Sequence, residues 1–147
     1  DYPQHPPLVK LLTTGNGTVR FNPNLYQDGK VCLSLLGTWS GPGWHPETST
    51  LLQVLVSVQA LIMVPDPCFN EPGHEALRNT PGGNSMSASY NLGVWENNVR
   101  YALLGAGKLP SPVFKKVIER HLVLKRRAIL QDCDKWEAEA NRLSGQR

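Results

Sequence analysis

The chain has 147 residues, which is the length of one domain and is enough to bury a hydrophobic core. Its net charge of +3 is too small to indicate a nucleic-acid-binding protein, and because the chain contains no long apolar run we expect neither a signal peptide nor a membrane span. The three cysteines, Cys32, Cys68 and Cys133, are odd in number and form no C-x-x-C pair, which argues against a disulfide framework and against a structural zinc site. We therefore expect a protein of a reducing compartment.

The first part of the chain is predicted to form a β-hairpin. Two prolines at positions 6–7 lead into a first apolar strand at residues 8–13, because proline can enter a strand but cannot sit in its centre. A Gly-Asn-Gly turn at residues 15–17 then allows residues 18–21 to return as the partner strand. Pro23 is expected to end that strand, since it has no amide hydrogen for a ladder.

The central part of the chain is predicted to form an amphipathic helix. Apolar residues recur at helical spacing from Thr50 to Met63, and we expect this helix to carry most of the core. Thr50 and Gln53 match a capping box at its start, in which each side chain bonds the other residue's backbone. Pro65 requires the helix to stop at about Val64.

The second half of the chain is predicted to contain a long loop and then helices. Residues 65–86 hold several proline and glycine turns, which predict a nearly structureless loop. A helix is expected to begin at the serines of residues 85–87 and to run to about Leu104. Ser111-Pro112 then forms an N-cap with proline at the first helical position, followed by one long helix or two shorter helices to about Leu143.

The strongest candidate site lies in residues 22–36, where two tight turns stand next to a cysteine. An Asn-Pro-Asn turn and an Asp28-Gly29 turn hold Cys32 close to the first asparagine side chains, which is more order than a simple connection needs. Cys32 is therefore a candidate nucleophile, and Asn24 is a candidate carboxamide beside it. Two plainer interpretations stand next to this one, because Cys32 can be an inert core residue and Asn24 a simple turn former.

A cysteine–histidine hydrolase is a further enzymatic interpretation, because a histidine base can activate such a nucleophile. The four histidines lie at positions 5, 45, 74 and 121, and none has a recognisable setting for a catalytic base. A histidine on the apolar stripe of a helix is more often packed in the core than catalytic, and a histidine in a loop is more often solvated than catalytic. Metal binding by such scattered histidines has still less support.

Four motifs, in order along the chain, resemble the catalytic core of ubiquitin-conjugating enzymes. The family patterns are Y-P-x-x-P-P-x-V, H-P-N…G-x-I-C-L, W-S-P and D-D-P, and their counterparts are Tyr2 to Val9, Asn22 to Leu33, Trp44-His45-Pro46 and Asn70-Glu71-Pro72. The second asparagine of the Asn-Pro-Asn turn stands eight residues before the cysteine, as in the family. Residues 32–39, 69–73 and 114–136 resemble the large members of the family, and most closely the apollon (BRUCE)-type branch.

The resemblance implies an α+β fold, in which an antiparallel meander sheet is flanked by a central helix and C-terminal helices. It also implies one ubiquitin-conjugating catalytic domain over residues 1–147, as a fragment of a longer chain. The family's N-terminal helix and first strands would precede Tyr2. We therefore expect the sheet to be incomplete and to have an exposed edge.

The resemblance also implies roles for individual residues. Cys32 would accept the C-terminal carboxyl of ubiquitin as a thioester, which a substrate lysine then attacks. Asn24 would brace the neighbouring loop and stabilise the oxyanion, and Glu71 would orient the incoming lysine and help to remove its proton. Three further positions are expected to support the loop: Asn22, where the family has histidine, Ser34, where many members have aspartate, and Trp44.

The partners that the resemblance implies are ubiquitin, the ubiquitin-activating enzyme, and either a ubiquitin ligase or an intrinsic ligase region of a larger chain. We expect no cofactor, no metal, no nucleic acid and no membrane partner. The expected location is the cytoplasm, with the nucleus as a second compartment. The main alternative is a non-catalytic module of the same fold that binds partners and in which Cys32 is inert.

Overall fold

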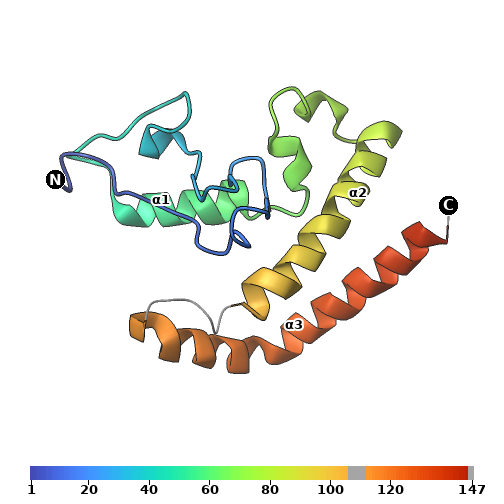
Figure 1. The fold of residues 1–147 in the computed structure, drawn as a ribbon. Coiled ribbons are helices and arrows are strands. Elements are labelled where there is room, and N and C mark those ends of the chain that lie inside the picture. Colours follow the sequence, from blue (N-terminus) through green and yellow to red (C-terminus); the bar gives the residue numbers. More distant parts are fainter. Residues whose placement is uncertain (106–111, 146–147) are drawn as a thin grey trace. The chain divides into compact units, whose positions relative to one another are not determined.

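The computed structural model describes residues 1–105 and 112–145, which belong to two compact units, Asp1–Asn91 and Leu92–Arg147. The three α-helices are α1 (Leu51–Ser57), α2 (Pro81–Asn97) and α3 (Lys115–Ser144) (Figure 1). The described residues also contain short helical segments: η1 (Ser34–Leu36), η3 (Pro67–Asn70), η4 (Glu75–Leu77) and η7 (Pro112–Phe114) are 3-10 helices, and η2 (Val58–Ile62) and η5 (Asn98–Leu103) are π-helical.

The predicted antiparallel meander sheet is wrong, because residues 1–105 and 112–145 contain only isolated bridges and no strand. Three antiparallel bridges are present, Lys10 with Lys30, Asn22 with Leu25, and Leu25 with Val31. A single bridge fixes one residue pair, and extending it into a ladder costs backbone entropy that burial must offset. Leu8 and Leu12 remain 104% and 57% exposed, so lengthening this segment into a strand would bury too little apolar surface.

The predicted hairpin between residues 8–13 and 18–21 does not form either. The carbonyl of Thr14 accepts the amide hydrogens of Gly17, Thr18 and Val19, at 3.1, 3.0 and 2.9 Å. These bonds close a compact turn, and they leave residue 19 without its amide for a strand partner. The turn predicted at residues 15–17 is present, but its hydrogen bonds go to Thr14 and it does not pair two strands.

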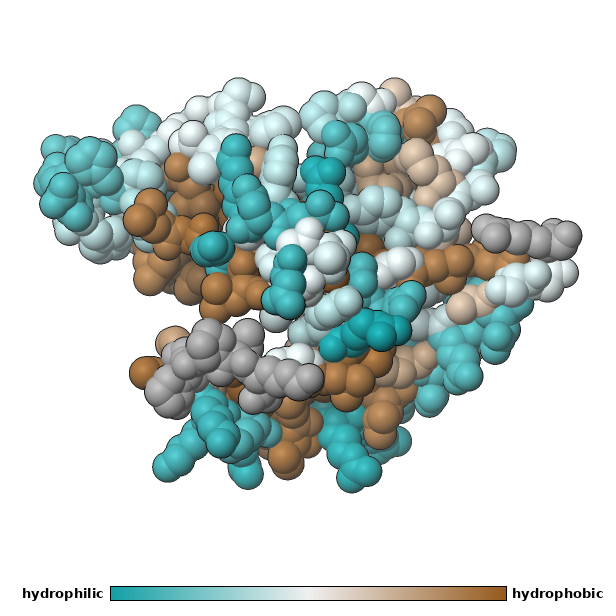
Figure 2. Space-filling view, in the orientation of Figure 1, coloured by the Kyte–Doolittle hydropathy of each residue, from teal (hydrophilic) through white to brown (hydrophobic). Residues whose placement is uncertain are grey.

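The helix predicted from Thr50 to Met63 is confirmed as α1 continued by η2, but its predicted share of the core is wrong. The Thr50–Gln53 capping box is present, with hydrogen bonds of 2.8 and 3.2 Å. Only Val54 and Ile62 are buried on these helices. Most other apolar side chains of this stretch are exposed, namely Leu51, Leu52, Leu55, Val56, Leu61 and Met63. Figure 2 shows hydrophobic surface over α1.

The buried core of the first unit comes mainly from its irregular segments. Its apolar members there are Val19, Phe21, Leu25, Val31, Cys32 and Leu33, and Cys68 and Phe69 of η3 add to them. Three of them, Val31, Cys32 and Leu33, are consecutive residues of the candidate site at residues 22–36. The candidate cysteine is therefore part of the core of this unit.

The region of residues 65–86 is more ordered than predicted. It holds η3 and η4, and the loop before η3 is tied to α2: Ser87 donates to Asp66 Oδ1 at 2.5 Å and Asn91 donates to the Pro65 carbonyl at 3.0 Å. α2 begins at Pro81, four residues before the predicted start, since proline suits the first helical position and Gly83 N donates to Thr80 Oγ1 at 3.0 Å. Gly83 is required there because a Cβ would lie 1.9 Å from the Leu77 carbonyl oxygen.

The second unit contains the end of α2, η5 and α3. Of the two forms predicted for the last helix, the single long helix is observed, and α3 ends close to the predicted residue 143. The predicted Ser111 cap lies outside the described residues. In the described ranges, no helix is both long enough and apolar enough to cross a membrane.

Candidate active site

The two candidate residues Asn24 and Cys32 are joined by reciprocal hydrogen bonds. Cys32 N donates to the Asn24 carbonyl at 2.8 Å, and Asn24 Nδ2 donates to the Cys32 carbonyl at 3.0 Å. The turn between them closes through Gly29 N and the Tyr26 carbonyl at 3.0 Å. Gly29 has φ +93°, and a Cβ there would lie 2.6 Å from the Leu11 carbonyl oxygen, so only glycine fits. The spacing of eight residues thus closes a fixed loop.

Asn22 anchors this loop to the rest of the first unit. Its side chain is among the most deeply buried in the chain, with 1% of the residue exposed. Asn22 Nδ2 donates to the Ile62 carbonyl at 2.9 Å, and Asn22 Oδ1 accepts from Asn24 N at 2.7 Å and from Asn70 Nδ2 at 3.4 Å. One carboxamide therefore connects the loop of Cys32 with the end of η2 and with the residue before Glu71.

Asn22→Ala is expected to lower the free energy of unfolding by about 2–4 kcal/mol, because two strong hydrogen bonds are lost and their buried partners stay unpaired. The backbone amides of Asn24 and Cys32 should also exchange faster with solvent. Urea unfolding and amide hydrogen exchange measure the two effects. Asn141→Ala, at an exposed position of α3, is the matched control. If Asn22→Ala lowered the free energy of unfolding no more than Asn141→Ala does, the anchoring role would be contradicted.

Thr38 holds the backbone on both sides of Cys32. Its hydroxyl donates to the Val31 carbonyl at 2.6 Å and accepts from Leu33 N at 3.0 Å. The sequence reasoning missed Thr38. Its threonine type alone carries no signal, because the contact depends on how residues 34–37 fold back as η1 with Gly37 in the left-handed region.

A small pocket brings the three predicted catalytic residues together. It has a volume of about 140 Å³, and Cys32, Asn24 and Glu71 are among its lining residues. The others are Arg20, Pro23, Tyr26, Trp39, Asn70 and Pro72. Cys32 is only 2% exposed, so the side chains around it cover most of its surface. None of the four histidines is among the residues that line this pocket, so the pocket offers no support for a cysteine–histidine pair.

Arg20 supplies the positive charge of this pocket, and the sequence reasoning missed it. Its guanidinium donates to the Pro23 carbonyl at 2.7 Å, lies 4.9 Å from the ring centre of Tyr26 and stands 3.8 Å from Glu71 Oε2. The ion pair with Glu71 is partly exposed and so contributes little to stability. Arginine near Glu71 could have been found only from the fold, since the two residues are far apart in sequence.

The two other residues predicted to support the loop lie outside the pocket lining. Ser34 begins η1 and faces Gly41, where a Cβ would lie 3.1 Å from Ser34 Cβ. Trp44 Nε1 donates to the Pro3 carbonyl at 2.7 Å, and its ring centre lies 5.8 Å from that of Tyr2. Trp44 thus fastens the N-terminal segment, and Trp39 is the tryptophan that reaches the pocket.

Tyr90 of α2, which feels the charges of the pocket residues Arg20 and Glu71, has a shifted pKa. Burial raises the pKa of its phenol above the ordinary value of 10.0, the Arg20 charge opposes that rise, and Cys68 and Glu71 add to it. The folded protein therefore keeps the phenol proton at a pH where the unfolded chain loses it. The corresponding stability is present below about pH 10 and is lost as pH rises further.

Tyr90→Phe is expected to flatten the loss of stability at high pH. The free energy of unfolding of the wild type should fall between about pH 8 and pH 11, and the fall should be smaller in Tyr90→Phe because its side chain has no proton to lose. Urea unfolding at the two pH values measures the difference. Tyr2→Phe, at an exposed position, is the control, and equal slopes in Tyr90→Phe and the wild type would contradict the prediction.

A cysteine held by a carboxamide, with a carboxylate lining the same pocket, is suited to acyl transfer through a thioester. In the part of the chain that the structure describes, no group of three His, Cys, Asp or Glu residues could hold a metal ion. The family model described as ubiquitin-conjugating enzyme matches residues 1–81, so the chain belongs to the ubiquitin-conjugating enzyme family.

Similar proteins support the same family. The chain is 52% identical to the human "Dual E2 ubiquitin-conjugating enzyme/E3 ubiquitin-protein ligase BIRC6", over 98% of this chain and 3% of that protein. It is 54% identical to "Probable ubiquitin-conjugating enzyme protein 17" of Caenorhabditis elegans, over 92% of this chain and 19% of the relative. It is also 53% identical to human "Ubiquitin-conjugating enzyme E2 Z", over 76% of this chain and 30% of that protein. The predicted family and its large branch are confirmed, and the chain spans only 3–30% of the length of these relatives.

Proposed function

We propose that this chain carries ubiquitin as a thioester on Cys32 and transfers it to a lysine of a protein substrate. The observation that carries the proposal is the shared pocket of Cys32, Asn24 and Glu71 in a member of the ubiquitin-conjugating enzyme family. The three residues come from two segments that are about forty residues apart. A nucleophile, an amide donor and a carboxylate that line one pocket are the groups that acyl transfer through a thioester uses.

The chemistry needs two acyl transfers. In the first, the Cys32 thiolate attacks the thioester that joins ubiquitin to its activating enzyme, and the thiolate of that enzyme leaves. In the second, a neutral lysine amine attacks the Cys32 thioester, an amide bond forms, the Cys32 thiolate leaves and the amine loses its proton. Exchange between two thioesters is nearly thermoneutral, because one thiolate is consumed and another is released.

The near-complete coverage of Cys32 favours one alternative function. At 2% exposure the thiol behaves in this conformation like a core residue, as it would in a non-catalytic module of the same family. Loading by ubiquitin requires the pocket to widen, and the side chains that can move there are Trp39 and Tyr26, 47% and 37% exposed. The two functions differ in whether a covalent ubiquitin adduct forms.

The deciding experiment is a loading reaction. The protein that carries this chain is incubated with ubiquitin-activating enzyme, ubiquitin and ATP, and adducts are resolved with and without a thiol reductant. An adduct that the reductant removes supports the proposal. No adduct with any activating enzyme, from a protein with normal circular dichroism, would leave the non-catalytic module as the function.

Glu71→Gln is expected to leave loading unchanged and to slow transfer to free lysine by about 10-fold or more, because a positioned base contributes up to ~10²–10⁴ to such a step. Lysine is almost fully protonated near neutral pH, since its ordinary pKa is about 10.4. The transfer rate of Glu71→Gln should therefore approach that of the wild type as pH rises towards that value and solvent deprotonates the amine. Single-turnover discharge from pre-loaded protein measures both effects.

Glu47→Gln is the matched control for Glu71, because Glu47 is an exposed carboxylate in a loop outside the pocket. Its discharge rate should equal that of the wild type at every pH. If Glu71→Gln slowed loading as much as discharge, Glu71 would act on the shape of the pocket and not on the incoming lysine.

The partners and location follow from the same proposal. Ubiquitin and a ubiquitin-activating enzyme are the partners of the two acyl transfers. A ligase activity, supplied by a separate protein or by another region of a larger chain, would bring the substrate; the name of the human relative joins both activities in one protein. We place the reaction in the cytoplasm and nucleus.

A further inference from the structure

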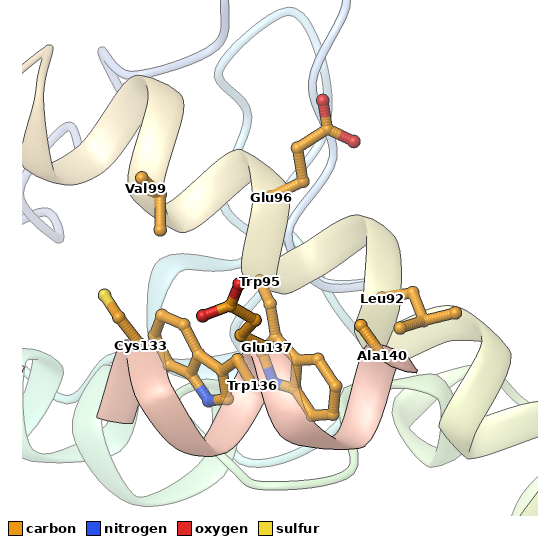
Figure 3. A pocket seen from close by; sticks show the side chains of 8 residues that line it. All are labelled: Leu92, Trp95, Glu96, Val99, Cys133, Trp136, Glu137 and Ala140. Carbon is orange, nitrogen blue, oxygen red and sulfur yellow. The ribbon is translucent and has the colours of Figure 1, made fainter. Parts of the chain in front are cut away.

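We propose that the second unit binds an arginine side chain of a partner protein in a groove between the end of α2 with η5 and the C-terminal half of α3. We call it the tryptophan groove, and its defining residues are Trp95, Glu96, Val99, Cys133, Trp136 and Glu137. Its volume is about 380 Å³. Figure 3 shows the side chains that line it. The groove lies within residues 92–140, shares no lining residue with the pocket of Cys32, and is not used by the proposed ubiquitin transfer.

Two indole rings provide the aromatic surface of the groove. The ring centres of Trp95 and Trp136 lie 6.2 Å apart, and the rings are parallel to within 7°. Figure 3 shows them side by side, one on each helix. Parallel indoles present extended negative faces, and a planar guanidinium stacks on such faces more favourably than a compact ammonium does. The shape of the aromatic surface therefore favours arginine over lysine.

The charge of the groove is negative. Glu137 forms no ion pair with any residue in the ranges 1–105 and 112–145, and Figure 3 shows its carboxylate beside the indole rings. Glu96 is already paired with Arg100 at 2.9 Å and points away from the rings. Glu137 is thus the carboxylate that can accept two parallel N–H bonds from a guanidinium that lies on the rings.

The size of the groove fits one side chain and not a folded partner segment. A volume of about 380 Å³ is near the lower end of the usual range for binding pockets. Leu92, Val99 and Ala140 add apolar lining for the methylene stem of an arginine. Asp132 and Glu139 of this half of α3 are already paired with Lys135 and Arg142, so the free negative charge of the groove comes from Glu137.

The test uses an acetylated and amidated Gly-Arg-Gly peptide and its citrulline counterpart, which has the same shape but no charge. Binding to the full chain is followed by the NMR signals of the four indole N–H groups. The arginine peptide should shift Trp95 and Trp136 but not Trp39 and Trp44. Citrulline should bind at least about 10-fold more weakly, because the charge contributes to both the ring and the carboxylate contact.

Variants of the chain identify the carboxylate. Glu137→Gln should weaken binding of the arginine peptide about 10-fold, while Glu119→Gln, an exposed carboxylate of α3 outside the groove, should not change it. Cys32→Ala should bind the peptide like the wild type. Equal affinity for arginine and citrulline, an unchanged affinity in Glu137→Gln, or shifts confined to Trp39 and Trp44 would each overturn the proposal.

Discussion

Cys32→Ala is expected to abolish the reductant-sensitive ubiquitin adduct and all transfer to lysine. The expected loss is complete within the sensitivity of the assay, because alanine has no group that can carry the acyl chain. Gel analysis of the loading reaction measures it. The substitution also removes a buried sulfur, so the free energy of unfolding should fall by about 1 kcal/mol, far too little to unfold the protein.

Cys32→Ser separates loss of the nucleophile from loss of structure. A serine at this position keeps the size of the side chain and should trap ubiquitin slowly as an oxygen ester, which the reductant does not cleave. Cys68→Ser and Cys133→Ala are the controls, because neither cysteine lines the pocket, and both variants should load normally. An adduct that survived Cys32→Ala and disappeared in either control would mean that the wrong cysteine was assigned.

Local signals in the sequence were sufficient to predict the helix formed by α1 and η2 and the residue at which it starts. Thr50 and Gln53 act on each other across three residues, so their pattern contains the whole interaction. The early start of α2 was missed because Pro81 was taken as a loop residue, although proline is favoured at a first helical position. That feature was readable from the sequence and was weighed wrongly.

The predicted sheet failed for a different reason. Periodic apolar residues show that a segment can pair, but a ladder also needs a partner of matching length and a face to bury. Residues 8–13 have one bridge to Lys30 and exposed leucines. In this structure the chain closes turns around Thr14 instead, and local hydrogen bonds replace the ladder. Sequence similarity to a family with a sheet did not reveal this difference.

The contacts of the candidate site also fall into local ones, which the sequence predicts, and long-range ones, which it does not. The spacing of Asn24 and Cys32 was readable because one short loop joins them. The contacts of Asn22 with Ile62 and of Arg20 with Glu71 each span at least forty residues, and no local pattern encodes them. The supporting role predicted for Asn22 has a geometric basis in these contacts. The catalytic roles of Cys32, Asn24 and Glu71 remain predictions that the variants described here test.

Asn24→Ala is expected to slow transfer to lysine by about 10²-fold, and to slow loading much less. One N–H of the Asn24 carboxamide donates to the Cys32 carbonyl at 3.0 Å, and the other has no partner among the described residues. The second N–H is therefore available to an oxyanion that forms beside Cys32, and removal of one such donor costs about 10²–10³ in rate. Single-turnover rates of the two steps measure the difference.

The difference between the two steps separates chemistry from loop support. When an amine attacks a thioester, the oxyanion must persist until the amine loses its proton, whereas a thiolate can leave at once from the intermediate of loading. A donor to the oxyanion therefore matters more for transfer than for loading. If Asn24 only braced the loop, Asn24→Ala would slow both steps equally and the Cys32 amide would exchange faster with solvent. Asn141→Ala, at an exposed residue that does not line the pocket, should leave the two rates and the exchange unchanged.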